Sequence, residues 1–474
     1  MSEQEVQFEK KLSPLGVWGL ALGAMIGWGC FVMPGDQLLP DAGPIGATIG
    51  LILGAAMIVI ISFSYSYLIS KYPVAGGEFV YADTAFGKTH AFLCGWFISI
   101  AYWALIPMNG TAVGLVARYL IPGPLQKWPL YEVAGWTVYA GELIVAVAAI
   151  VIVGLVNMRG VEAAGWFQTA VAVGLVGAML IIAAAILIGG VDWSNLKPYF
   201  ASDKSAIASI FAVASLAPWA YVGFDCIPQA SEEYSFSNKK TKALLISSIS
   251  VAALMYMIAN IATAVVAPWE TFIAENSNWP TGAAIEQLIG TIGLILLAIA
   301  MLCGIISGLN AFYLAGSRLL YSMAVAEAIP SAFGKLDPVH KVPRFGIVFM
   351  MVLAAIAPFF GRQVLSWLVD MTAVGADMGF TYTTASAFVL ARRAGDKKQA
   401  VISFIGLCFA IFFICLLILP FSPGFLSVQA WICLIIWLVL GGIFFAVKHK
   451  TYYSSTALQE KVAVIVAENE KNND

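Results

Sequence analysis

Long apolar runs recur along almost the whole chain, and they restrict its possible folds more than any other feature. A helix needs about 20 predominantly apolar residues to cross the hydrocarbon core of a bilayer. Runs of that size alternate here with polar or Gly/Pro breaks. They predict twelve membrane-spanning helices, at 15–33, 44–70, 90–120, 135–157, 163–189, 206–230, 243–267, 290–326, 345–360, 364–390, 400–421 and 425–447.

The composition agrees with a chain dissolved in lipid. Apolar residues make up 61% of it and charged residues 11%, against roughly 45–50% and 25% in ordinary soluble domains. Many of the 43 glycines and 20 prolines lie inside apolar runs, as membrane helices tolerate. The longest hydrophilic stretch is 448–474. These features exclude a soluble core and leave no room for a soluble catalytic domain.

The positive charges predict the orientation of the spans, because lysines and arginines of short loops prefer the cytoplasmic side. With both termini placed inside, all but five of the 25 lysines and arginines fall in inner segments. The polar segment 1–14 precedes an apolar run without a cleavage pattern, so we expect it to be retained. We therefore predict a multi-pass protein of the inner or plasma membrane with cytoplasmic termini. The five outer cations are Arg118, Lys127, Lys197, Lys204 and Arg362.

Signatures of enzymes and metal sites are missing from the sequence. Its three histidines lie far apart, and its seven cysteines fall within apolar segments without a metal-ligand or disulfide spacing. Gly87-Lys88-Thr89 matches the end of a phosphate-binding loop, but Ala82 stands where that loop needs its first glycine. We expect no enzymatic activity, no catalytic residue, no metal, no cofactor and no nucleic-acid partner.

The first apolar run contains a glycine-rich segment, residues 23–31, which reads GAMIGWGCF. A glycine costs a helix interior about 1 kcal/mol relative to alanine, so Gly27 and Gly29 favour unwinding around Trp28. Unwound backbone at membrane depth must be buried in protein or line a wet cavity. Its free N–H groups suit a carboxylate and its free carbonyls suit an ammonium group. Alternatively, the glycines only permit close helix packing.

A second break is predicted in the sixth run, at residues 217–228, which read APWAYVGFDCIP. Pro218 and Pro228 each remove a backbone donor, and between them lie Gly223 and the ionisable Asp225. Interrupted helices at the first position of each half point to the binding site of an inverted-repeat transporter. We therefore expect a solute site where the two interruptions meet.

Four segments together resemble the amino acid–polyamine–organocation permease superfamily over nearly the whole chain. Residues 23–31 are similar to its glycine-rich substrate loop, and 223–233, from Gly223-Phe224-Asp225 through Glu232-Glu233, resemble its sixth-helix segment. Residues 317–324, followed by 329–330, 333, 335–336 and 342–343, resemble its eighth helix and the next cytoplasmic loop. Residues 70–73 with 76–78 and Tyr81 resemble its first inner loop.

The resemblance implies an all-α polytopic fold of the leucine-transporter type. It has ten helices in two inverted five-helix repeats, plus two peripheral helices, which fits twelve spans. The implied division is a cytoplasmic N-terminus at 1–14, a first repeat at 15–190, a second repeat at 206–390, helices eleven and twelve at 400–447, and a cytoplasmic tail at 448–474.

The resemblance also implies where a substrate would lie. Its carboxylate would contact the N–H groups of Gly27, Trp28 and Gly29. Its amine would face the carbonyls near Met25, Ile26 and Trp219 or Ala220. The candidate side-chain walls are Tyr102, Trp103, Tyr221, Phe224 and Asn310. Packing or lipid contact is the alternative for the aromatic residues among them.

Trp28 departs from the family, which commonly has a small residue there, so the resemblance leaves substrate specificity open. The coupling ion is open too, between H⁺, Na⁺ and simple exchange. Several proton-coupled members carry a lysine in helix five, whereas 168–177 contains none and Gly174 or Leu175 stands near that place. A sodium site would need carbonyls of helix one and a hydroxyl of helix eight, for which Ser307 is available.

Asp225 and Asp377 are the acidic candidates for coupling or gating, because ionisable groups inside membranes are usually functional. The alternative is that each accepts hydrogen bonds near a helix break. Glu232 and Glu233 are expected to form gate or loop ion pairs.

From these observations we expect a secondary active transporter that moves amino acids by alternating access, with a small-molecule substrate and the lipid bilayer as its partners. A polyamine or other organic amine is the alternative substrate. It needs several carboxylates, and only Asp225 and Asp377 are expected at midplane. A non-transporting amino acid sensor or a channel is the alternative of another class.

Overall fold

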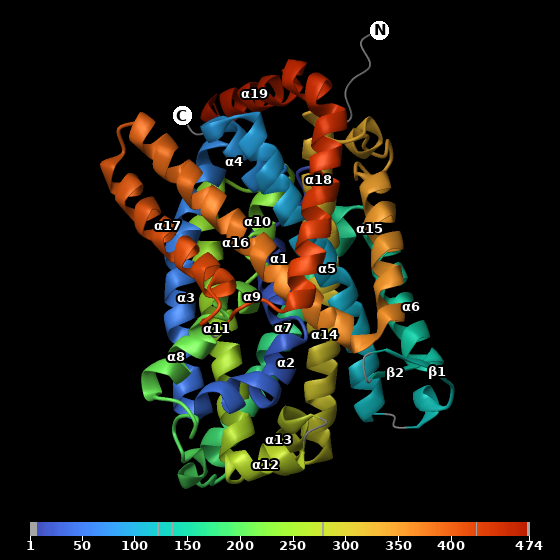
Figure 1. The fold of residues 1–474 in the computed structure, drawn as a ribbon, viewed down its shortest axis with the longest axis vertical. Coiled ribbons are helices and arrows are strands. Elements are labelled where there is room, and N and C mark those ends of the chain that lie inside the picture. The colour runs from blue at the N-terminus through green and yellow to red at the C-terminus, as the bar shows by residue number, and fades with distance from the viewer. Residues whose placement is uncertain (1–6, 121–122, 134–135, 277–278, 423, 472–474) are drawn as a thin grey trace.

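The computed structural model describes residues 7–120, 123–133, 136–276, 279–422 and 424–471, and helices dominate it (Figure 1). The first six residues of the predicted N-terminal segment and the last three of the predicted tail lie outside this range. Most long helices run along the long axis of the molecule (Figure 1). This arrangement is the one expected of a bundle that crosses a bilayer.

The first helix begins where the sequence signals it, since Ser13 precedes Pro14 and its hydroxyl accepts the N–H of Gly16 at 3.1 Å. The elements of the first half are α1 (Pro14–Ile26), α2 (Gly29–Met33), the π-helix η1 (Pro34–Leu38), α3 (Leu39–Lys71), α4 (Gly77–Phe86), α5 (Lys88–Leu120), η2 (Pro124–Gln126), β1 (Pro129–Val133), β2 (Trp136–Tyr139), α6 (Ala140–Asn157), α7 (Val161–Ile188) and η3 (Trp193–Leu196).

The second half begins with short helices and continues with long ones. Its elements are α8 (Ala206–Ala214), α9 (Ala217–Ala220), α10 (Cys226–Gln229), η4 (Ser231–Glu233), η5 (Asn238–Lys240), α11 (Thr241–Val265), α12 (Trp269–Glu275), α13 (Pro280–Ile289), α14 (Thr291–Val325), η6 (Ser331–Gly334), α15 (Arg344–Ile356), η7 (Ala357–Phe360), α16 (Gly361–Arg393), α17 (Lys397–Ile418), α18 (Val428–Ser454) and α19 (Ala457–Lys471).

The protein is a multi-pass membrane protein. Within the described ranges, eight helical stretches are long and apolar enough to cross a bilayer, and 344–360 is a shorter apolar helix. The predicted sixth span is divided into α8, α9 and α10, as its prolines predicted. The eight stretches are Pro14–Lys71, Lys88–Arg118, Ala140–Asn157, Gln168–Ile188, Asn238–Val265, Thr291–Val325, Lys397–Ile418 and Val428–Ser454.

The helices form a packed centre with a looser edge. Helix α5 lies against α14, α16 and α6, while α1 lies against α14, α7 and α11. Helices α17 and α18 contact α16 but bury only 22% and 17% of their most apolar windows. Large apolar side chains such as Phe404, Ile411 and Ile432 are exposed on them. In a bilayer these side chains contact lipid, so α17 and α18 form the periphery.

One hairpin departs from the expected all-helical chain. Strands β1 and β2 pair antiparallel near the end of the molecule opposite the termini (Figure 1). Tryptophan, valine and tyrosine in 136–139 favour a strand over a helix. The predicted fourth span therefore begins at Ala140 and not at residue 135.

Both chain ends lie at the same end of the molecule (Figure 1), which we call the terminal face. Below this face, Arg318 of α14 forms a two-pronged ion pair with Glu233, with Nε–Oε1 at 2.7 Å and Nη2–Oε2 at 3.1 Å. Both side chains are 1% exposed. The pair joins α14 to the segment after α10.

Helix α19 lies across the terminal face (Figure 1). The ammonium group of Lys461 is 2.8 Å from Glu232 Oε1 and 4.6 Å from the centre of the Tyr321 ring. At the other end of the helix, the Asn469 amide donates to the carbonyl of Ser70 at 3.0 Å. The hydrophilic tail is therefore packed on the helix bundle. The expected ion pairs of Glu232 and Glu233 are both present.

The buried ion pair yields a stability prediction. Arg318→Met leaves Glu233 buried without a partner, which should lower the free energy of unfolding by about 3–5 kcal/mol. Adding Glu233→Gln should restore most of the loss. Chemical unfolding in detergent micelles measures both. Lys204→Met, which breaks a pair with Asp41 whose side chains are 32% and 37% exposed, should cost at most about 1 kcal/mol. Equal losses in Arg318→Met and Lys204→Met would contradict a structural role for the buried pair.

Candidate functional site

The predicted interruption of the first helix is present. Helix α1 ends at Ile26 and α2 begins at Gly29. Gly27 caps α1 with a φ of 44°, in the region that favours glycine. Its N–H donates to the carbonyl of Gly23 at 3.0 Å. Of the three N–H groups predicted to hold a carboxylate, that of Gly27 is therefore already used within the helix.

The sixth span is interrupted as well. Helix α9 ends at Ala220 and α10 begins at Cys226, with a turn at 221–225 between them. Gly223 has a φ of 129°, and its N–H donates to Asp225 Oδ1 at 2.6 Å. Asp225 thus shapes the turn by accepting a backbone hydrogen bond, which is the alternative role that the sequence left open for it.

The two interruptions touch each other in the middle of the molecule (Figure 1). A Cβ atom on Gly223 would lie 2.5 Å from the Cβ atom of Ala24 and 2.9 Å from the nitrogen of Met25. No side chain fits at this distance. The glycine therefore allows the turn of the sixth span to lie directly on the end of α1, which brings the loosened backbone of both helices to one place.

Aromatic side chains surround this place. The rings of Trp28 and Trp219 meet edge to face with centres 5.5 Å apart. A Cβ atom on Gly29 would lie 2.7 Å from Trp219 Cη2 and 2.8 Å from the hydroxyl of Tyr256. That hydroxyl donates to the carbonyl of Met25 at 3.3 Å. Trp28, Gly29, Met25 and Trp219 therefore form one cluster.

Two indole N–H groups among the predicted site residues have no partner within the described part of the chain. These atoms, Trp103 Nε1 and Trp219 Nε1, are both buried. Buried donors are nearly always paired in folded proteins. These two are therefore candidate donors to a polar ligand.

Asn109 of α5 is a candidate that the sequence interpretation missed. Its side chain is 2% exposed, and its Nδ2 donates to Leu105 O at 2.8 Å. Its Oδ1 is buried and has no partner among the described residues. That oxygen is 3.2 Å from where a Cβ on Gly27 would stand and 3.0 Å from the equivalent point on Gly308. An amide inside a long apolar run was the available signal.

Three other residues predicted to line the substrate site make hydrogen bonds or ring contacts within the protein. Tyr102 donates to the carbonyl of Asp225 at 3.1 Å, and Tyr221 donates to the carbonyl of Leu51 at 3.0 Å. The ring of Phe224 packs between Tyr65 of α3 and Phe380 of α16, with centres 5.1 Å and 5.3 Å away. These side chains fix the turn of the sixth span to α3, α5 and α16. Ala220 and Ile26 are also buried.

Asn310 belongs to a buried network between α1, α6, α7 and α14. Its Nδ2 donates to Gln168 Oε1 at 3.1 Å, and its Oδ1 accepts from Asn157 at 2.9 Å. Gln168 Nε2 in turn donates to the carbonyl of Gly19 at 2.9 Å and to the hydroxyl of Ser307. The amide of Gln168 thus lies between the carbonyl of Gly19 in α1 and the hydroxyl of Ser307 in α14. These are the kinds of oxygen that a sodium site would need.

The sequence placed Gly174 or Leu175 near the position of a family lysine. In the structure Gly174 has open space around it, and Gln168 is a residue of α7 that reaches α1. Ser307 lies directly against the first helix, because a Cβ atom on Gly23 would overlap its hydroxyl at 1.5 Å.

Asp377 of α16 is fully buried, and neither of its carboxyl oxygens has a partner in the part of the chain that is described. A buried polar group without a partner needs an explanation, and inside a membrane that explanation is usually functional. Among the described residues, no group of three or more histidine, cysteine, aspartate or glutamate side chains is placed to hold a metal ion.

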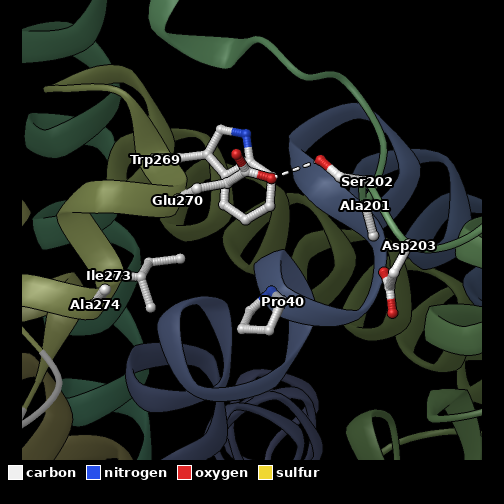
Figure 2. A pocket seen from close by; sticks show the side chains of 8 residues that line it. All are labelled: Pro40, Ala201, Ser202, Asp203, Trp269, Glu270, Ile273 and Ala274. Carbon is white, nitrogen blue, oxygen red and sulfur yellow. Dashed lines mark hydrogen bonds between the residues drawn. The ribbon is translucent and has the colours of Figure 1, made fainter.

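A pocket of about 340 Å³ lies elsewhere, between the start of α3 and α12 (Figure 2). Pro40, Asp203 and Trp269 line it, and the Ser202 hydroxyl donates to Glu270 Oε1 at 2.7 Å across one side. None of its lining residues belongs to α1, α9 or α10. It is separate from the place where the two interruptions meet.

The sequence profile of the amino acid permease family matches residues 12–444, which includes both interrupted helices and the contact between them. The chain belongs to this family. The permease is thus a member of the amino acid–polyamine–organocation superfamily, as its sequence segments indicated, and it is a transport protein and not an enzyme.

The permease is similar over nearly its full length to characterised transporters of Bacillus subtilis. It is 25% identical to a methylthioribose transporter, over 91% of this chain and 92% of that protein. It is 22% identical to the branched-chain amino acid permease BcaP, over 92% of both chains. It is 24% identical to the serine/threonine exchanger SteT, over 84% of this chain and 87% of that protein.

The contact between the interruptions can be tested with one methyl group. Gly223→Ala places a Cβ 2.5 Å from Ala24 and forces a strained φ. We expect amino acid uptake into proteoliposomes to fall by about tenfold or more, which corresponds to about 1.4 kcal/mol. Gly174→Ala adds the same atom in open space and should leave uptake unchanged. Equal uptake by the two variants, at equal membrane levels, would show that the contact is dispensable.

Proposed function

We propose that this permease is a secondary active transporter that carries a zwitterionic amino acid by alternating access, with the substrate between the interruptions of α1 and of the sixth span. The observation that carries the proposal is the direct contact of Gly223 with Ala24 and Met25. Two helices that lose their regular hydrogen bonds at one place offer donors and acceptors to one small solute.

The polar groups around the contact suit both ends of an amino acid. The proposed carboxylate donors are the N–H groups of Trp28 and Gly29. The proposed amine acceptors are the carbonyls of Ile26 and Trp219 and the unpartnered Oδ1 of Asn109. An ammonium group has three donors and needs several such acceptors.

We propose twelve spans, with the two inverted repeats at 15–190 and 206–390. The family and the interruption of the first and sixth predicted spans support this division. The peripheral place of α17 and α18 supports their assignment outside the repeats. The lysine and arginine distribution supports a cytoplasmic terminal face and a location in the cell membrane.

In this orientation, the ion pair of Arg318 and Glu233 closes the cytoplasmic side. The pair joins α14 to the segment after α10, and Lys461 and Glu232 add a second link from α19. Release of the substrate to the cytoplasm then requires that the segment after α10 moves away from α14. The closing contacts are ionic, and water can compete for them once they begin to separate.

We propose that transport does not use sodium. Gln168 donates to the carbonyl of Gly19 and to the hydroxyl of Ser307, so a cation there would have to displace an amide that already pairs these oxygens. Acidic groups that can hold a proton are available instead, Asp225 and Asp377 among them.

An amine substrate is less well supported than an amino acid. A polyamine needs more than one free carboxylate, but Asp225 Oδ1 is held by the N–H of Gly223. Methylthioribose is a further candidate, because one similar transporter is named for it. Both compounds therefore belong in a substrate test.

Uptake by purified protein in proteoliposomes tests the proposal. We expect a neutral amino acid, such as alanine, serine or leucine, to be taken up. Putrescine and methylthioribose at tenfold excess should not compete. Replacing sodium by choline should change the rate less than twofold. Strong competition by putrescine or methylthioribose would assign the site to that compound. Binding of the amino acid without flux would identify a sensor.

Asn109 gives a more local test. Asn109→Leu removes the unpartnered oxygen and should raise the half-saturating amino acid concentration by about tenfold or more, because one hydrogen bond to a charged group contributes about 1.5–3 kcal/mol. Thr111→Val, on the same helix, removes a hydroxyl that is bonded to the Pro107 carbonyl of its own turn and should have little effect. The same affinity in both variants would remove Asn109 from the binding site.

A further inference from the structure

Glu78 is a buried carboxyl group that the proposed substrate site does not use. It lies in the first turn of α4, between the first and second spanning stretches, and it is fully buried. Its Oε2 accepts a hydrogen bond from Gln229 Nε2 at 2.5 Å. Its Oε1 is buried, and no partner for it is found among the residues that the structure describes.

Glu78 is linked to the turn of the sixth span by hydrogen bonds. Gln229 Nε2 is 3.5 Å from the hydroxyl of Tyr102, and that hydroxyl donates to the carbonyl of Asp225 at 3.1 Å. A short chain of polar groups therefore connects α4 with the place where the two interruptions meet. A change at either end alters the polar environment of the other.

Glu78 also lies where the terminal face closes. A Cβ on Gly77 would be 3.1 Å from the Cβ of Pro228, so α4 is pressed against α10. Beside this contact, the N–H of Ala75 donates to Glu232 Oε1 at 2.9 Å. If the segment around α10 moves away to open the terminal face, water reaches Glu78. While the face is closed, Glu78 is shielded.

The titratable groups that face Glu78 carry no positive charge. They come from α3, α4, α5, α10 and the turn at 221–225, and the acid among them is Asp225. Burial and the charge of Asp225 raise the pKa of Glu78 well above its ordinary value. The groups are Tyr65, Tyr81, Cys94, Tyr102, Asp225 and Cys226.

We propose that Glu78 is the proton-binding site that couples amino acid transport to a proton gradient. The inference rests on the proposed function, and it names the ion that accompanies the substrate. One proton from the side opposite the terminal face binds a carboxylate oxygen of Glu78 and forms one O–H bond. When the terminal face opens, that bond breaks and the proton passes to water on that side.

The coupling follows from the cost of burying a charge. An ionised carboxylate without a cation is costly in a dry interior. When the substrate fills the site and displaces water, the closed state requires neutral Glu78. When the site is empty, water can enter it and reach the ionised group along the polar chain of Tyr102 and Gln229, and the carrier can return without a proton. One proton therefore moves with one substrate molecule, in the same direction.

Proteoliposomes with an imposed pH gradient and a membrane potential clamped at zero test the inference. The probe is the amino acid with the highest uptake in the substrate panel. The wild-type protein should accumulate it up to about tenfold per pH unit, because one pH unit is a tenfold ratio of protons. Glu78→Gln keeps the shape of the neutral acid. It should lose all accumulation above equilibrium and retain exchange of labelled for unlabelled substrate.

Two further variants keep the test decisive. Asp83→Asn changes another carboxyl of α4, which accepts from Gln459 at 2.7 Å, and it should keep full accumulation. If Glu78→Gln does not fold, Glu78→Asp should keep accumulation with a shifted pH profile. Accumulation by Glu78→Gln, or an unshifted profile in Glu78→Asp, would overturn the inference. Wild-type transport without accumulation in response to the pH gradient would also overturn the inference, but it would not contradict the proposed substrate site. No amino acid transport by the wild type would overturn the proposed function itself.

Discussion

The structure depends on two helices that stop being helical inside an apolar bundle, at the same place. Backbone N–H and C=O groups without partners are costly at membrane depth, so such interruptions persist only when something else pairs these groups. At Gly223 the Asp225 carboxylate accepts the N–H, and at Met25 the Tyr256 hydroxyl donates to the carbonyl. The protein thus satisfies part of the loosened backbone itself, and a substrate can satisfy the rest.

This arrangement explains why the supporting side chains come from so many helices. Tyr102 of α5, Tyr221 and Phe224 of the turn, and Tyr256 of α11 each bind backbone or pack against a neighbouring ring. A turn in the middle of a bundle has no helical hydrogen bonds of its own to keep its shape. Its position therefore depends on neighbours, and movement of those neighbours is the means by which access to the site can change.

The sequence predicted the interruptions well, because their signals are local. Glycine and proline alter the backbone at the residue where they occur, so 23–31 and 217–228 were identifiable without a structure. The roles of Gln168, Asn109 and Glu78 were not. Gln168 contacts Ser307 and Asn310, which lie more than a hundred residues away in the sequence. Glu78 contacts Gln229 across a similar separation in the sequence. The sequence around Gln168 and Glu78 does not indicate such distant partners. For Asn109, the only signal in the sequence was a polar side chain inside an apolar run.

The buried acids differ mainly in what each one is paired with. Glu233 has the guanidinium of Arg318, so its charge is balanced and its role is to hold two segments together. Asp225 has a backbone N–H and is tied to the turn that it shapes. Glu78 has the neutral amide of Gln229 for one oxygen and the neutral hydroxyl of Tyr65 nearby, and Asp377 has no partner among the described residues. A fixed positive charge would hold a carboxylate ionised throughout the transport cycle. A carboxyl group that must gain and lose a proton as the protein opens and closes needs a neutral partner that tolerates both forms, and Glu78 has that kind of partner at the interface that has to open.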